Sequence, residues 1–256
     1  SWSETSQSPE RPLAAAHCGR VRRSAYCAPM KTITQTFSPG VRALFAILAL
    51  ALVAGCGQAP EAGRVAVPDD PADVRPLLPG MTVPAFTAPD PDGRERRFTP
   101  GELERPLVVT FYRGGWCPYC SKHLMAYRDI EPELLDLGYE LLFVSPDRPE
   151  VSKQHLAGSD FEITLLSDSD MAISRAFGIA FRVDEDTVRR YREEHDIDIE
   201  GDSGQTHHLL PVPATYVIGT DGVVRFMYAN PNYRDRLDPA LLVTAARLAS
   251  AEGAEG

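Results

Sequence analysis

The chain holds few cysteines, and their spacing excludes several classes of protein. Five occur in 256 residues, too few within any one folded stretch to staple a small secreted domain through a disulfide framework. A four-thiolate zinc site needs a second Cys-x-x-Cys pair, and the sequence has none. Haem attachment needs histidine directly after such a pair, where Ser121 stands instead. The cysteines occupy positions 18, 27, 56, 117 and 120.

The chain also lacks an excess of positive charge and a long apolar run. Its net charge is −10 at pH 7, and basic residues outnumber acidic ones only in residues 1–56. We therefore expect no nucleic-acid partner. The apolar run from Ala43 to Ala54 is shorter than the about 20 residues that span a bilayer. The hydrophobic fraction of 43% and the charged fraction of 24% are ordinary for a folded domain.

Residues 30–55 have the pattern of a signal peptide. A short basic stretch beginning at Met30-Lys31 precedes the apolar run, and small residues follow it. The end of this segment, Val53-Ala54-Gly55-Cys56, resembles the lipobox of bacterial lipoproteins, which implies that Cys56 is lipidated. A plain secretory signal or a short membrane anchor is the alternative. We interpret residues 1–29 as an untranslated or disordered segment upstream of the true start, and so give Cys18 and Cys27 no role.

The next segment predicts a tether between the lipid and a folded body. Residues 56–77 contain four prolines and almost no large apolar side chains, a composition typical of a semi-extended linker. A single domain is predicted over residues 78–256. The expected location is the bacterial cell envelope, where the lipid would hold the domain at a membrane facing the periplasm or the exterior.

The central motif of the chain is Trp116-Cys117-Pro118-Tyr119-Cys120. It follows the apolar run Leu107 to Tyr112, so it lies where a buried strand passes into a helix. The unpaired N–H groups of the first helical turn favour a thiolate at Cys117, and Pro118 fits the first helical position. We expect Cys117 to be the nucleophile and Cys120 to be the shielded thiol that resolves its mixed disulfide. Trp116 and Pro118 are candidate substrate contacts.

The pattern of strands and helices predicts an α/β fold with a central mixed sheet flanked by helices. A βαβ unit over 107–144 is expected to carry the motif on its helix, with a kink at Pro132 and an end at Gly138. The acidic segment 181–208 interrupts the later elements and predicts a surface helix around Tyr191, more often a solvated face than a functional one. The other expected elements are a hairpin at 85–87 and 96–98, strands at 163–166, 214–219 and 223–228, and helices at 149–157, 170–177 and 238–251.

These residues resemble a known superfamily. The body from Leu77 to Ala249 is similar to the alkyl hydroperoxide reductase/thiol-specific antioxidant superfamily, and Phe111 through Cys120 resembles its peroxiredoxin-like branch with a Cys-x-x-Cys pair. The resemblance implies a thioredoxin-like fold. Pro213 through Ile218 resembles the cis-proline strand of that fold, which implies that Pro213 faces the disulfide and contacts substrate. The stretch 230–237, with Tyr233 and Arg236, is also similar to this branch.

One departure from the superfamily bears on the reaction. Peroxiredoxins read Phe-Tyr-Pro-x-x-x-Thr-x-x-Cys, and this pattern places Arg113 at the proline, Cys117 at the threonine and Cys120 at the peroxidatic cysteine. The catalytic arginine of the family, expected near the start of the 214–219 strand, is replaced by Val212-Pro213. Dithiol exchange survives these substitutions better than peroxidase chemistry does.

The predicted function is therefore that of a thiol-disulfide redox enzyme of the antioxidant type. Its dithiol would reduce protein disulfides or peroxides, with a protein thiol or a thioredoxin-type reductant as partner, and with no cofactor or bound metal. Two alternatives stay open. One is a thioredoxin-dependent thiol peroxidase with Cys120 peroxidatic and Cys117 resolving. The other is a Cu(I)-delivery protein in which His208 joins the two thiolates, because thiolate and imidazole suit that ion.

Overall fold

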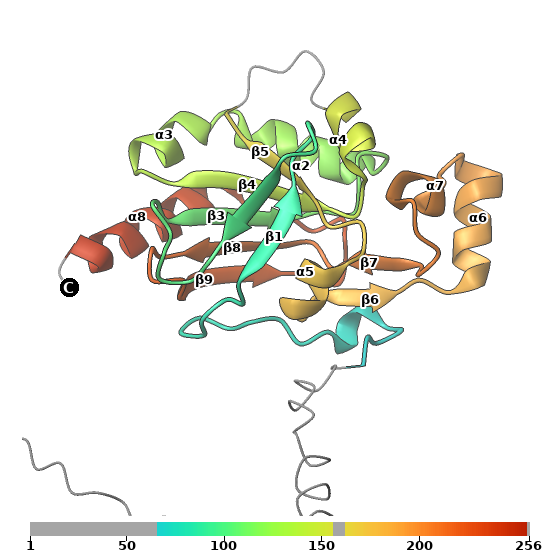
Figure 1. Ribbon diagram of the computed structural model, residues 1–256, viewed down its shortest axis with the longest axis horizontal. Coiled ribbons are helices and arrows are strands. Elements are labelled where there is room, and N and C mark those ends of the chain that lie inside the picture. Colours follow the sequence, from blue (N-terminus) through green and yellow to red (C-terminus); the bar gives the residue numbers. More distant parts are fainter. Residues whose placement is uncertain (1–65, 156–161, 255–256) are drawn as a thin grey trace, which may run out of the picture. The chain divides into compact units, whose positions relative to one another are not determined.

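The computed structural model describes residues 66–155 and 162–254 (Figure 1). The predicted upstream segment, signal peptide and lipidated Cys56 lie outside these residues, as does most of the predicted tether. None of the helices in the two described ranges is long and apolar enough to cross a membrane.

A five-stranded sheet forms the centre of the domain. Its order is β5-β4-β3-β8-β9, and β3 is fully buried because it lies in the middle and is apolar on both faces. The pairs β3–β4 and β4–β5 are parallel, whereas β3–β8 and β8–β9 are antiparallel. The predicted mixed sheet is confirmed. Its strands are β3 Leu107–Phe111, β4 Glu140–Ser145, β5 Thr164–Ser167, β8 Ala214–Ile218 and β9 Val224–Ala229.

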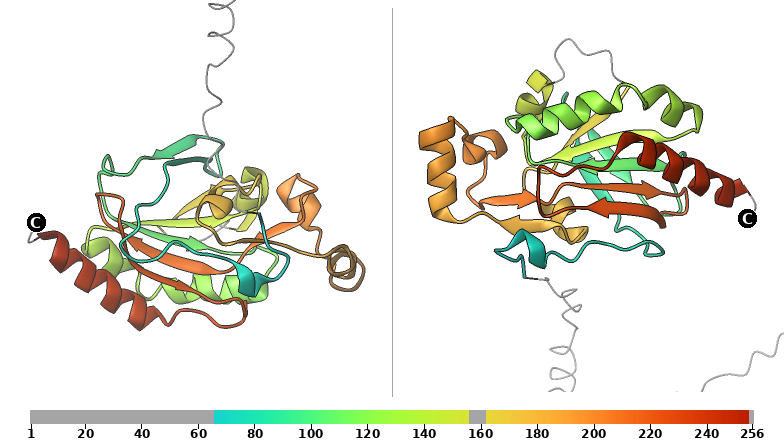
Figure 2. Two further views of the ribbon diagram at one scale, coloured as in Figure 1. Left: turned by 90° about the horizontal axis from the view of Figure 1, so that it is seen from below. Right: turned by 180° about the vertical axis from the view of Figure 1, so that it is seen from behind.

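Helices cover one face of the sheet, and a hairpin with a short helix covers the other (Figures 1 and 2). The helical face carries α2, which begins directly after the cysteine motif, together with α3 and α8. The elements of the first face are α2 Pro118–Tyr127, α3 Glu131–Asp136 and α8 Pro239–Ala254. Those of the second are β1 Phe86–Pro89, β2 Glu95–Phe98 and α5 Ala172–Ala176, while η1 Pro71–Asp73 and α4 Pro149–His155 lie at the periphery.

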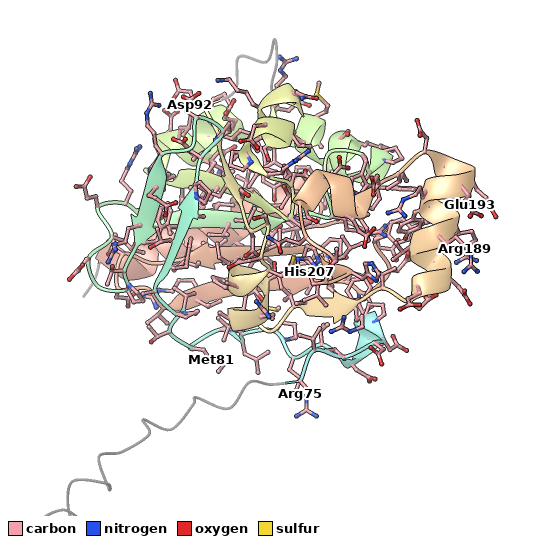
Figure 3. The ribbon with its side chains drawn as sticks, turned by 45° about the vertical axis from the view of Figure 1, so that its right-hand side comes forward. Arg75, Met81, Asp92, Arg189, Glu193 and His207 are labelled. Carbon is pink, nitrogen blue, oxygen red and sulfur yellow. The ribbon has the colours of Figure 1, made fainter. Side chains whose placement is uncertain are left out.

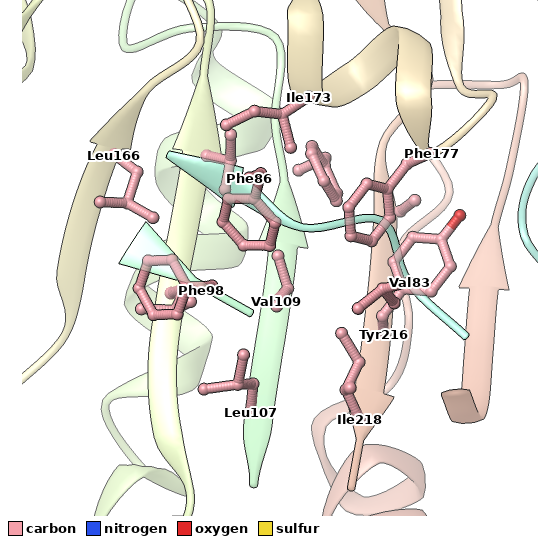
Figure 4. Close-up of a cluster of buried hydrophobic side chains, with 14 of the residues drawn as sticks. Val83, Phe86, Phe98, Leu107, Val109, Leu166, Ile173, Phe177, Tyr216 and Ile218 are labelled. Carbon is pink, nitrogen blue, oxygen red and sulfur yellow. The ribbon is translucent and has the colours of Figure 1, made fainter. Parts of the chain in front are cut away.

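Alternation along β3 divides the core into two clusters. Val109 points to the hairpin side, where it meets an aromatic group that includes Phe86, Phe98 and Phe177 (Figure 4). The Phe177 ring lies 5.1 Å from that of Tyr216 at 76°, an edge-to-face contact typical of aromatic cores. Val108 points to the opposite side, into the cluster that contains both cysteines of the motif. The sheet thus separates the redox motif from the larger aromatic core.

The predicted helix with a kink at Pro132 is two helices. The first ends at Tyr127 and the second begins at Glu131, with Pro132 in its first turn. Proline has no N–H and its ring clashes with the preceding turn, so it is better placed at a helix start than inside one. Gly138 follows the second helix at φ +86° and ends it as predicted.

The acidic segment 181–208 is a small module rather than a lone surface helix. Its predicted helix is confirmed as α6 Glu185–His195, and a second helix, α7 Ile199–Ser203, follows. The module joins the domain through a strand pair that the sequence pattern did not predict, β6 Ala180–Arg182 with β7 Leu209–Pro211. We call residues 180–211 the insertion. Figure 3 shows Arg189 and Glu193 on the outer side of its long helix.

The tether prediction is wrong for residues 66–77, which pack on the domain. The Arg75 N–H donates to the Gly178 carbonyl at 2.9 Å, and the Leu77 N–H donates to the Phe177 carbonyl at 3.1 Å. Leu77 also packs against the aromatic core. Proline-rich composition predicted an unattached linker, but the N–H groups between the prolines are free to pair with carbonyls at the end of α5.

Gly178 tests this attachment. Its φ is +70°, and a Cβ there would lie 2.0 Å from the Arg75 carbonyl oxygen, whereas Gly138 has φ +86° and open space around it. Both Gly178→Ala and Gly138→Ala lose about 1–2 kcal/mol from left-handed backbone strain, and Gly178→Ala loses more because it also displaces residue 75. Urea unfolding of both variants measures the difference, and amide exchange at Arg75 and Leu77 should accelerate only in Gly178→Ala. Equal losses would contradict the attachment.

Candidate redox site

A tight loop after β3 places the cysteine motif. Gly114 has φ +136°, and a Cβ there would lie 2.4 Å from Trp116 Nε1, so only glycine fits. The Gly115 N–H donates to Asp147 Oδ2 at 2.9 Å, which ties the loop to the end of the neighbouring strand β4. The Cys117 N–H then donates to the Gly114 carbonyl at 3.2 Å. The loop therefore delivers Cys117 to the N-terminus of α2.

Helix α2 is anchored to the sheet at its C-terminal end. The Tyr127 hydroxyl lies 3.0 Å from Thr110 Oγ1 on β3 and 3.2 Å from Thr215 Oγ1 on β8. All three groups are buried, and a buried hydroxyl network of this kind fixes geometry because each partner is costly to lose. Helix α2 cannot shift along the sheet without breaking this hydroxyl network.

Both thiols of the motif are buried and face each other. Cys117 is 1% exposed and Cys120 is 4% exposed, and each thiol shifts the pKa of the other. Neither is in a disulfide. The expected nucleophile, Cys117, is therefore shielded from solvent as fully as Cys120.

The hydrogen bond between the two sulfurs separates their ionisation. It lowers the pKa of Cys117 well below the ordinary value, against the opposing effect of burial, and the Cys120 N–H and the guanidinium groups of Arg113 and Arg236 act in the same direction. The pKa of Cys120 is raised, first by this hydrogen bond and then by burial and the charge on Cys117. The pair at neutral pH therefore holds one proton, with the negative charge on Cys117.

Arg236, in the loop between β9 and α8, contacts the second sulfur. Its Nη2 donates to Cys120 Sγ at 3.3 Å, and the Arg113 backbone N–H is a second donor to this sulfur. Arg236 Nε and Nη1 are buried without a partner, so donors of the same guanidinium are left unused beside the thiol. The sequence pattern drew attention to 230–237 but gave Arg236 no role.

A pocket of about 160 Å³ opens at Cys120. It is far smaller than the several hundred Å³ of sites that hold drug-sized ligands, so it suits a small molecule. Cys117 is not among its lining residues, which are Tyr112, Gly114, Gly115, Cys120, Ser121, His123, Leu124, Met125 and Phe143.

His123 lines this pocket as a neutral imidazole. Burial and, to a smaller extent, the charge of Arg236 lower its pKa to about 4, and its Nε2 is buried without a partner. His123 does not help to lower the thiol pKa, because an uncharged ring adds no positive field. Lys122, the other basic neighbour in the motif, is exposed.

Arg113 is enclosed by three aromatic rings, a group we call the Arg113 cage. Its guanidinium carbon lies 5.0 Å from the Trp116 ring, 5.8 Å from the Tyr191 ring and 4.2 Å from the Tyr233 ring, within the range of cation–π attraction. Its Nη2 donates to the Tyr191 hydroxyl at 2.6 Å. The cage joins the motif loop, the insertion and the loop that carries Arg236. The sequence gave no sign of it.

Pro213 differs in its peptide geometry from the cis-proline strand that it resembles. No peptide bond is cis among the described residues, so the expected cis-proline is absent there. The preceding residue, Val212, is fully buried and donates its N–H to the Ile179 carbonyl at 2.8 Å. The Val212 N–H is therefore paired with the residue just before the insertion, and Pro213 stays a candidate substrate contact. Trp116, half-buried in the cage, and Pro118, exposed in the first turn of α2, stay candidate contacts.

The copper-delivery alternative finds no support in the geometry. His208 Nε2 lies 2.8 Å from Glu200 Oε1 within the insertion. In the two ranges that the structure describes, no group of three or more His, Cys, Asp or Glu side chains converges as a metal site. The third ligand that this alternative requires is thus not gathered with the two thiols.

The model of the AhpC/TSA family matches residues 79–227, more than half of the chain, including the motif, the insertion and all but the last two residues of the central sheet. The chain belongs to the AhpC/TSA family. Peroxiredoxin Bcp of Escherichia coli K12 is 33% identical over 106 residues, which are 41% of this chain and 67% of that protein. Chloroplastic peroxiredoxin Q of Gentiana triflora is 30% identical over 152 residues, 59% of this chain and 58% of that protein.

Solved structures show the same fold. Peroxidoxin BcpB from Mycobacterium tuberculosis superposes with a TM-score of 0.51 at 22% identity, covering 67% of this chain and 97% of that one. A peroxiredoxin-like protein from Aquifex aeolicus gives 0.53 at 16% identity, covering 68% and 88%. The expected thioredoxin-like fold of the peroxiredoxins is confirmed, and the protein is an oxidoreductase, a peroxiredoxin-like antioxidant enzyme.

The shared proton gives a test of the thiol pair. Cys120→Ala removes the hydrogen bond to Cys117, so the Cys117 pKa should rise towards the ordinary thiol value of about 8.5. Cys120→Ser keeps a hydroxyl donor at the same place and should leave much of the lowering intact. The ultraviolet absorbance of the thiolate, followed against pH in the reduced variants, measures both. An unchanged pKa in Cys120→Ala would show that the sulfur–sulfur contact does not govern ionisation.

Proposed function

We propose that the protein reduces small hydroperoxides, with Cys120 as the attacking sulfur and Cys117 as its base and resolving partner. The observation that carries the proposal is the position of Cys120, which at once lines the pocket and accepts a hydrogen bond from Arg236. Cys117 has neither property. This choice follows the alternative in which Cys120 is peroxidatic rather than the first expectation from the sequence.

The reaction begins on the hydrogen bond between the two sulfurs. The Cys117 thiolate accepts the Cys120 proton, and Cys120, now ionised beside Arg236, attacks the terminal oxygen of the peroxide. The O–O bond breaks, the alkoxide or hydroxide leaves with the proton from Cys117, and Cys120 becomes a sulfenic acid. Both electrons that reduce this bond come from the Cys120 sulfur.

The second half of the cycle closes the disulfide. The Cys117 thiolate attacks the sulfur of the Cys120 sulfenic acid and displaces hydroxide, which takes up a proton as water. Because the Cys117 pKa is low, the resolving sulfur is ionised and ready for attack at neutral pH. A thioredoxin-type dithiol then returns the pair to the reduced state.

Arg236 supplies the charge that the usual arginine of the family would supply. Its contact stabilises the thiolate on Cys120, and its unpaired Nε and Nη1 belong to the same planar group. A charge-assisted donor aimed at the reacting atom is worth more inside a buried site than in water.

Single-turnover oxidation by hydrogen peroxide tests these roles. Cys117→Ser should stop at a sulfenic acid on Cys120, trapped by dimedone, whereas Cys120→Ser should not react at a comparable rate. Arg236→Gln should slow oxidation by about 100-fold, the usual loss when one such donor is removed. Arg234→Gln, which alters an exposed arginine two residues away, is the matched control. Sulfenic acid on Cys117 in Cys120→Ser, at the rate of the unaltered protein, would reverse the assignment.

Dithiol exchange with protein disulfides is the second candidate. The lowered pKa of Cys117 and its place at the N-terminus of α2 favour it, because that thiolate is a suitable nucleophile towards a disulfide. A stable mixed disulfide at Cys117 in Cys120→Ser, formed faster with a protein disulfide than with peroxide, would support this function over the first.

We also propose that the enzyme is a lipoprotein of the cell envelope. The pattern of residues 30–56 supports this location, with Cys56 as the lipid-bearing residue. Expression of the full chain in a bacterium with a labelled fatty acid should label the protein and sediment it with membranes. Cys56→Ala should lose both properties, while Cys27→Ala keeps them. Equal labelling of the two variants would contradict the proposal.

A further inference from the structure

The insertion reaches the redox motif through Tyr191 and through the apolar cluster beneath it. The Tyr191 ring on α6 lies 5.8 Å from the Trp116 ring, and its hydroxyl accepts the 2.6 Å hydrogen bond from Arg113. Trp116 packs against two clusters at once, the one that contains both thiols and the small apolar cluster of the insertion. The contact therefore links a surface module to Trp116, the residue next to Cys117.

The two sides of α6 differ in what they face. Arg189 and Glu193 lie on its outer side (Figure 3), and Tyr191, two residues from each, is turned by about 200° because successive residues differ by about 100°. Val188, one turn before Tyr191, is buried on the same inner side. The charge run is thus the solvated face of a helix whose other face packs on the motif.

The insertion has its own internal supports. Arg192 pairs with Asp198 at 3.0 Å and with Glu200 at 2.5 Å, and Glu200 also contacts His208. These pairs join the two helices to the return strand, and Val183, Val188, Ile199 and Leu210 pack beneath them. The module is held together apart from its contact with Trp116 and Arg113, so loss of that contact need not unfold it.

We propose that Tyr191 is a specificity-determining residue, which holds the insertion over Cys117 and excludes folded protein disulfides from that thiol. Small peroxides still reach Cys120, because the pocket there is lined by residues of β4, α2 and the loop between β3 and α2, not by the insertion. The access of small peroxides to Cys120 rests on the proposed peroxidase function. The exclusion of protein disulfides from Cys117 does not depend on that function and is tested separately.

Two maleimides of unequal size measure the access. In Cys120→Ser protein, the reaction of Cys117 with N-methylmaleimide and with a maleimide coupled to a small folded protein is followed by mass spectrometry of the Cys117 peptide. Adding Tyr191→Ala should raise the ratio of the large-reagent rate to the small-reagent rate at least about tenfold, because the insertion then moves away from Cys117 more easily. Tyr191→Phe keeps the ring but loses the Arg113 hydrogen bond and should give a smaller rise.

The control is Arg189→Ala, on the outer side of the same helix, which should leave the ratio unchanged. An unchanged ratio in Tyr191→Ala, or an equal rise for both reagents in every variant, would overturn the proposal. Peroxide oxidation of the two-cysteine protein separates the two hypotheses. Failure of the unaltered protein to react with peroxide would remove the peroxidase function, while the maleimide ratio still decides the role of Tyr191.

Discussion

Two sulfur atoms share one proton at a junction from which water is almost excluded. A thiolate in such a place is unfavourable unless donors surround it, and the structure provides them from separate parts of the chain. The Cys120 thiol and N–H serve Cys117, while Arg236 and the Arg113 N–H serve Cys120. The glycine loop, the anchored helix and the arginine loop all have to hold their places for this arrangement to exist.

The placement of Arg236 shows that position in space matters more than position in the chain. The family pattern expects an arginine near the start of β8, where this protein has Val212 and Pro213. Val212 instead donates its N–H to the carbonyl of Ile179, the residue just before the insertion. A guanidinium from the loop after β9 reaches the cysteine from another direction. The same charge is therefore available without the usual sequence signal.

The insertion changes what can approach the motif. In an open redox motif of this type the first cysteine is the accessible one, whereas here its side chain is covered and the second cysteine lines the pocket. The Arg113 cage joins the insertion to the site. Arg113, which stands where peroxiredoxins have proline, therefore acts together with α6, which lies far along the sequence.

The sequence by itself determined the α/β order, the mixed sheet and the strand–helix position of Cys117 and Cys120, because these follow from local patterns of apolar residues, glycine and proline. It also determined the existence of α6 around Tyr191. Three features depended on tertiary structure: the docking of residues 66–77 beside Gly178, the burial of Cys117, and the contacts of Arg236 and Tyr191 with the site. Each arises from segments that are distant in the chain, and no local pattern records which distant groups will meet. The tertiary structure excludes water from the site that these distant segments form. It therefore decides which sulfur a substrate reaches and which sulfur is covered.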